Sequence, residues 1–262
     1  MGAFKLILAV FLVRAAMIHC APPTFMLKAN DSILFLGGMN VVTGGAMPYG
    51  FINVIKQEVQ TLYSNITVVS RGFADDDANQ LLSNLNFILT RGIKPTKAII
   101  SVGLEAFITH TDDSSRIRLK FELESLVARL KQDKIEVALC PLTIHGERVD
   151  IDKEMDDLIQ LYTLINKEVA REYSVMHVNL PTQLAQYLGS NNLDKLDHSV
   201  LTLDGSILNE KGHMFVALAL LRAFGVSQHS LSRDNPVLEE QLRVQGIKEE
   251  TERVEVRRRA HA

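Results

Sequence analysis

Short apolar runs alternate with longer amphipathic segments along most of the chain. Most of the runs are apolar throughout, which is typical of parallel strands that are covered by helices on both faces. They predict five strands, at residues 33–36, 66–69, 98–102, 135–139 and 175–178. Helical periodicity predicts helices at 51–63, 79–91, 116–132, 153–173 and 211–224. Five strand–helix units in series predict an α/β protein, a three-layer α/β/α sandwich around a five-stranded parallel sheet of the flavodoxin-like kind.

The third predicted helix carries the clearest core face. Its leucines and valine recur at spacings of three and four, at Leu119, Leu123, Leu126, Val127 and Leu130. Cys140 ends another apolar run, so we expect it to be a buried thiol rather than part of a disulfide framework.

Composition and charge define the domain. Of the 262 residues, 47% are hydrophobic and 23% charged, as in globular proteins. With 28 basic and 31 acidic residues there is no cationic excess to favour nucleic-acid binding. Residues 1–28 carry a net +3 and residues 227–262 a net charge of zero, so the part between them carries −6. We predict one acidic domain at 29–226, followed by a charged extension at 227–262. The extension is interpreted as a solvated appendage, with partner binding as the alternative.

The first 22 residues are predicted to be a leader. Their apolar run at 6–13 is too short to span a bilayer and has the proportions of a signal peptide, so no transmembrane span is expected in the mature chain. Two N-glycosylation sequons, at Asn30 and Asn65, are compatible with the secretory pathway or an extracellular location. The leader has no acidic residue, which leaves a mitochondrial transit peptide as the alternative.

Ligands of a doubly wound sheet bind at the carboxyl ends of the strands. The loops to consider are therefore 37–50, 70–77, 103–113, 140–150 and 193–210. They fall in or beside four segments, ILFLGGMNVVTGG, VVSRGFADDDANQLL, AIISVGLEAF and LTLDGSILNEKGHMFVALALLRAF. In order and spacing these segments resemble the four conserved blocks of SGNH/GDSL-type esterases, and most of all the isoamyl-acetate-hydrolysing esterases. The resemblance covers nearly all of residues 31–226 and implies the SGNH hydrolase type of sandwich.

The resemblance also implies where catalytic groups would stand. The family's nucleophilic serine falls on Met39, its oxyanion-hole glycine on Asp75, its asparagine on Glu105 and its histidine on Ile207, while Asp204 is retained. A thioether cannot be deprotonated, an isoleucine transfers no proton, and a carboxylate repels a developing oxyanion. The sequence therefore predicts a catalytically inactive hydrolase-like protein with a binding or structural role.

One alternative keeps esterase activity. Asn30-Asp31-Ser32-Ile33 resembles a displaced Gly-Asp-Ser-Ile, which would make Ser32 the nucleophile, although Ser32 precedes the first strand instead of following it. His213 matches a framework position of the last block. His145, in a strand-end loop, is the better-placed histidine but has no nucleophile assigned to it.

The replaced positions suggest other roles. Asp75, Glu105 and Asp204, with His145 nearby, would form an acidic cleft for a small ligand or for Ca²⁺ or Mg²⁺, which prefer oxygen ligands. Alternatively, residues 75–77 cap the helix that begins near Ala78, and Glu105 is solvated. No other cofactor is predicted. A protein partner, with the chain as a subunit of a larger complex, is the other hypothesis.

Overall fold

A single parallel sheet organises the chain. The computed structural model describes residues 25–73, 78–90, 94–102, 107, 113–148 and 152–226. The strand order is β2-β1-β3-β4-β5, and every pairing is parallel. The strands are β1 (Ser32–Gly37), β2 (Thr67–Gly72), β3 (Lys97–Ser101), β4 (Glu136–Leu139) and β5 (Met176–His177). All five predicted strands are thus confirmed with small shifts at their ends, and so is the flavodoxin-like order.

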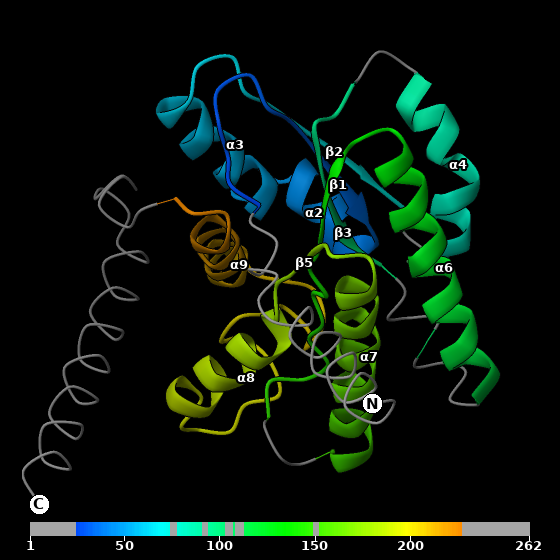
Figure 1. Cartoon of the computed structure of the whole chain (residues 1–262). Helices are drawn as coiled ribbons and strands as arrows, with labels where there is room; N and C mark the ends of the chain where they lie inside the picture. The colour runs from blue at the N-terminus through cyan, green and yellow to red at the C-terminus, as the bar shows by residue number, and fades with distance from the viewer. Residues whose placement is uncertain are drawn as a thin grey trace, which may run out of the picture.

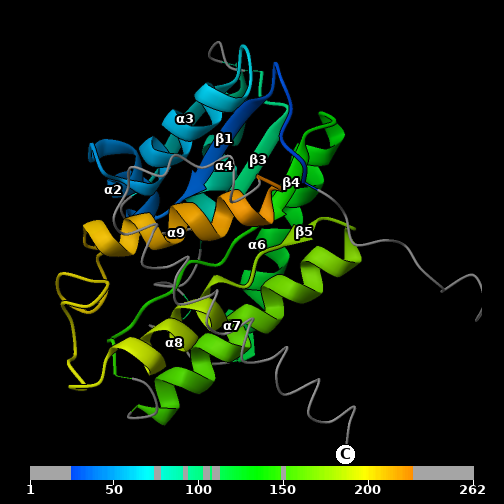
Figure 2. The same cartoon turned by 90° about the vertical axis from the view of Figure 1, so that its left-hand side faces the viewer.

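Helices cover both faces of the sheet (Figure 1). One layer holds α3 (Phe51–Leu62), α8 (Leu180–Asn191) and α9 (Glu210–Ala223), which face the viewer in Figure 2. The other holds α4 (Ala78–Thr90), α6 (Asp113–Gln132) and α7 (Lys153–Glu172). The predicted three-layer sandwich is confirmed.

Each face of the sheet has its own apolar core. Ile33 and Phe35 of β1 pack towards the layer of α3, α8 and α9, whereas Leu34 and Leu36 pack towards the layer of α4, α6 and α7. Burial on both sides explains why the central strands are mainly apolar, whereas the edge strand β2 also carries polar residues. The predicted core face of α6 is confirmed, because its five apolar residues are at most 4% exposed. Cys140 is buried and free, and burial raises the pKa of its thiol.

Two helices lie outside the sequence-based prediction. Residues 37–50 were expected to be a loop, which was wrong, because α2 (Met39–Ala46) lies within them. Its sequence MNVVTGGA has little intrinsic helix propensity. The helix is held by packing: Val41 is buried, and Gly44 lies so close to Phe51 that a Cβ at this glycine would come within 2.4 Å of the ring. Tertiary contacts of this kind leave no local pattern in the sequence.

The second missed helix, α8, did have local signals. Asn179 is its N-cap and accepts a hydrogen bond from the backbone N–H of Thr182 at 3.2 Å. Pro181 stands in the first turn, where proline is favoured. An N-cap followed by this proline predicts a helix start.

Both ends of the described domain meet at the amino edge of the sheet. The rings of Phe25 and Phe224 lie 4.8 Å apart between centroids, and the backbone N–H of Leu27 donates to Phe224 O. The predicted leader and C-terminal extension lie outside the described residues. Within the described ranges, no helix is both long enough and apolar enough to cross a membrane.

Candidate functional site

The end of β1 runs directly into α2 at the carboxyl edge of the sheet. Gly37 is required there, because a Cβ at this position would come within 2.4 Å of Ser101 O. The backbone N–H of Gly38 donates to the same carbonyl at 3.2 Å. Met39, 40% exposed, is the first residue of α2. The strand-to-helix turn thus presents a thioether at the position where the family resemblance places a nucleophile.

Ser101 joins the ends of three strands. Its carbonyl accepts from Gly38 after β1, and its hydroxyl accepts from the backbone N–H of Leu142, just after β4, at 3.1 Å. The loop that continues from Leu142 carries His145, which is exposed. Met39 and His145 therefore belong to one edge of the sheet.

The His145 loop touches the turn that contains Asp204. The backbone N–H of Gly146 donates to Gly205 O at 2.8 Å, and both glycines have positive φ, 70° and 96°. A left-handed backbone favours glycine at both positions. The structure therefore brings His145 and Asp204 into adjoining turns.

The Asp204 carboxylate is used by its own turn. Its Oδ1 accepts from the backbone N–H of Ile207 at 2.8 Å, from that of Ser206 at 2.9 Å and from the Ser206 hydroxyl at 3.1 Å. These bonds, that from Ile207 first, hold the pKa of Asp204 below its usual range. Ile207, where the resemblance places the base, donates its backbone N–H to this carboxylate. Asp204 thus stabilises its own turn.

Glu147 is a buried residue of this edge that the sequence did not reveal. It is 1% exposed and accepts from the backbone N–H groups of Val200, Leu201 and Thr202 at 2.7, 2.7 and 2.5 Å. The Thr202 hydroxyl donates to it at 2.6 Å. The buried Glu147 carboxylate thereby holds the β4–α7 loop against the connection between α8 and α9; these four hydrogen bonds are called the Glu147 clasp. A glutamate in a polar loop gives no sequence signal of such burial.

One serine–histidine contact lies on this clasped connection. Ser199 Oγ is 2.7 Å from His198 Nδ1, and both residues are exposed. Ser199 has a φ of 87°, which is rare for a residue other than glycine. The next three backbone N–H groups, at 200–202, are all bonded to Glu147, so none of them is available to stabilise an oxyanion beside Ser199.

Four other hydroxyls at the carboxyl edge have local partners, whereas the buried Thr143 hydroxyl has none among the described residues. Thr43 Oγ1 donates to Met39 O at 3.1 Å, and Ser206 Oγ donates to Asp204. Thr202 donates to Glu147, and Ser101 accepts from Leu142. These hydroxyls serve the local structure of the edge.

His213 lies in the core behind this edge. It is fully buried, its ring is 6.0 Å from those of Tyr49 and Phe51, and its Nδ1 accepts from the backbone N–H of Phe51 at 3.4 Å. Burial lowers the pKa of His213 to about 4, so the ring is neutral at pH 7. Its position is that of a packing residue.

Ser32 and the two sequons lie at the opposite, amino edge. Ser32 is the first residue of β1, so the six-residue strand separates it by about 20 Å from the Met39 end. Asn30 and Asn65 are exposed and adjacent, with Asn65 Nδ2 donating to Asn30 Oδ1 at 3.3 Å. A glycan on either asparagine would lie far from the carboxyl edge.

Two members of the predicted acidic cleft, Asp75 and Glu105, lie outside the described residues. Residues 75–77, which were the alternative caps of α4, also lie outside the described residues. Within the described part of the chain, no group of three or more histidine, cysteine, aspartate or glutamate side chains is arranged to hold a metal ion. Asp204 and His145 therefore do not form such a group with other described residues.

Solved structures share this fold. The acetyl xylan esterase AlAXEase is 22% identical, with a TM-score of 0.65 over 73% of this chain and 98% of its own. A catalytic variant of the acetylxylan esterase Axe2 from Geobacillus stearothermophilus is 19% identical, with a TM-score of 0.62 over 77% and 97%. A protein assigned as a GDSL-like lipase from Parabacteroides merdae is 15% identical, with a TM-score of 0.64 over 78% and 100%.

These likenesses establish the fold that this chain shares with esterases. No protein-family model matches the sequence, and no curated protein matches it significantly.

Proposed function

We propose that this chain is a non-hydrolytic protein of the SGNH type, which keeps the esterase scaffold and uses it for binding or assembly. Within the superfamily, the four motif segments favour the isoamyl-acetate-hydrolysing esterases as the nearest group. The shared fold with acetyl xylan esterases supports the superfamily assignment.

The observation that carries the proposal is the chemistry at the β1–α2 turn and at the Asp204 turn. Met39 provides no nucleophile, Ile207 provides no base, and Asp204 is bonded to its own backbone. Acyl transfer requires a nucleophile, a base within hydrogen-bond reach and free oxyanion donors. The described carboxyl edge lacks the first two at the family positions.

The alternative is an active esterase with a displaced nucleophile. Ser32 is unfavourable because it lies at the amino edge of the sheet. The His198–Ser199 pair has the serine–histidine contact that a nucleophile requires. The backbone N–H groups that follow Ser199, however, already donate to Glu147. An active nucleophile at Ser32 or at Ser199 would form a covalent adduct with a serine-directed reagent, so labelling tests both serines.

Binding in place of catalysis takes one of two forms. As a subunit, the chain would purify from its source in an assembly of fixed stoichiometry with a second polypeptide. As a binding module, it would be a monomer with a ligand or a Ca²⁺ or Mg²⁺ ion near Asp204, Asp75 and Glu105. A thermal shift with either ion that is lost in Asp204→Asn would support the ion, and no shift with either would exclude it.

We further propose that the chain enters the secretory pathway, with a mitochondrial location as the alternative. Asn30 and Asn65 are both exposed, as glycan carriers must be. Mass spectrometry of the protein from its source, before and after glycosidase treatment, tests this location. A loss of glycan mass supports the secretory route, and an unmodified Asn30 and Asn65 with a mitochondrial N-terminus would contradict it.

The experiment for inactivity is labelling with a fluorophosphonate, followed by intact-mass measurement. We expect no adduct on the wild-type chain. A stoichiometric adduct that disappears in Ser32→Ala or Ser199→Ala would overturn the proposal and identify the nucleophile.

A further inference from the structure

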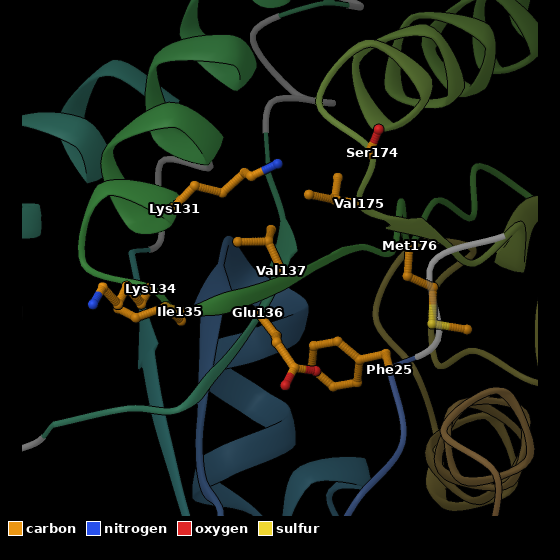
Figure 3. Close-up of a pocket in the computed structure, with 9 residues that line it drawn as sticks. All are labelled: Phe25, Lys131, Lys134, Ile135, Glu136, Val137, Ser174, Val175 and Met176. Atoms are coloured by element: carbon orange, nitrogen blue, oxygen red, sulfur yellow. The ribbon is translucent and has the colours of Figure 1, made fainter. Parts of the chain in front are cut away.

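A pocket lies at the amino edge of the sheet, at the end opposite the esterase-like turn. It encloses about 410 Å³, within the range of about 300–1,000 Å³ that is usual for small-molecule sites. Its walls come from the end of α6, the starts of β4 and β5, and Phe25 (Figure 3). Val137, Val175 and Met176 give it an apolar lining beside Phe25.

The acidic group of this pocket, Glu136, shares a buried cation with Asp31. Glu136 accepts from the Nζ of Lys97 at 2.5 Å, and Lys97 is 1% exposed. The same ammonium lies 3.8 Å from Asp31 and 4.9 Å from the centre of the Phe25 ring. With Lys131 and Lys134, which also line the pocket, three ammonium groups stand against these two carboxylates, so the surroundings favour an anion over a cation.

The basic group that faces the pocket has unused donors. Lys131 extends from the end of α6 towards Ser174 and Val175 in Figure 3, and its Nζ donates to Tyr173 O. An ammonium has three donors, so two remain. Lys134 also lines the pocket, but its ammonium is turned away from the other side chains in this view. The pocket therefore combines one directed cation with an apolar lining.

We propose that this pocket binds a small amphipathic anion, an aliphatic carboxylate. Its head group accepts hydrogen bonds from Lys131, and its hydrocarbon chain packs on Val137, Val175 and Met176. Burial of each methylene contributes about 0.8 kcal/mol, and the charge-assisted bond to Lys131 fixes the orientation. The site shares no residue with the carboxyl edge, so it stands whether or not the chain hydrolyses esters.

The test is calorimetric titration of the full chain with sodium octanoate. We expect saturable binding that weakens at least tenfold in Lys131→Met and stays within twofold in Lys134→Met, the matched control with the same loss of charge. In the wild type, affinity should increase about fourfold per methylene from butyrate to octanoate.

Several results would overturn the proposal. These are the absence of saturable heat with octanoate, equal weakening in both lysine variants, or binding of octyltrimethylammonium as tight as that of octanoate. The chain-length series and the cationic probe need no variant, so they decide the matter even if Lys131→Met fails to fold. Circular dichroism melting of the two variants establishes whether it does.

Discussion

The two edges of the sheet each bury a charged residue, but they satisfy it differently. At the carboxyl edge, Glu147 is bonded to three consecutive backbone amides and one hydroxyl of the α8–α9 connection. At the amino edge, Lys97 is paired with Asp31, which directly precedes β1, and with Glu136, which begins β4. The first edge uses its polar groups to build loops, whereas the second keeps a pocket and a lysine with unused donors. The carboxyl edge is nevertheless not fully satisfied: among the described residues, Asn40 Oδ1, Thr143 Oγ1 and His177 Nε2 are buried there without a hydrogen-bond partner.

Removing the Glu147 clasp is expected to have the largest effect. Glu147→Ala leaves three backbone N–H groups without their acceptor in a buried setting, so the free energy of unfolding should fall by about 3–4 kcal/mol. Urea denaturation measures it. Glu168→Ala, which removes only a half-exposed carboxylate 3.9 Å from Lys120, is the control and should cost less than about 0.5 kcal/mol. Equal losses of unfolding free energy in the two variants would contradict a stabilising role for the buried hydrogen bonds of Glu147.

Removing Lys97 from its charge cluster with Asp31 and Glu136 at the amino edge is expected to cause the second largest loss of stability. Lys97→Met leaves Asp31, 1% exposed, without its cation, and we expect a loss of about 3 kcal/mol in the same measurement. The double variant with Asp31→Asn should recover part of the loss, because no buried charge then remains beside the apolar side chain. Lys94→Met, at an exposed position of the same edge, is the control. A double variant less stable than Lys97→Met would contradict the pairing.

The buried His213 predicts a smaller, pH-dependent effect. Its pKa of about 4 in the folded state lies below its usual value of 6.5, so its contribution to stability is complete above pH 6.5 and declines as the pH falls towards 4. At pH 5 the loss should be about 1–2 kcal/mol relative to pH 7. His213→Asn should remove its share of this pH dependence and leave that of His177, whose pKa is also lowered by burial to about 4, whereas His145→Asn, at an exposed position, should leave both. An unchanged profile in His213→Asn would refute the assignment.

The smallest effect is expected at Asp204. Asp204→Ala removes the acceptor of the Ser206 and Ile207 amides in an exposed turn, which costs about 0.5–1 kcal/mol. A spectral comparison by NMR should show changes confined to this turn and the adjoining His145 loop. Loss of an activity in this variant would instead make Asp204 a working catalytic residue.

The sheet and most helices were predictable from the sequence, because burial on both faces makes the interior of most strands apolar. The carboxyl edge was predictable only in part. The Met39 and Ile207 positions follow from motif order, but the Glu147 clasp depends on loops about 50 residues apart and leaves no local pattern. Lys97 does have a signal: in a parallel sheet, charged residues that begin neighbouring strands lie side by side, as Lys97 and Glu136 do in the register of β3 and β4. Opposite charges at these positions predict the pair.

The most direct test of the proposed inactivity is turnover of p-nitrophenyl acetate by the full chain. We expect a rate equal to that of an equal concentration of heat-unfolded protein, with no saturation and no change in Ser32→Ala or Ser199→Ala. Saturable turnover above that blank, abolished by either substitution, would show that the esterase fold has kept its chemistry with a displaced nucleophile.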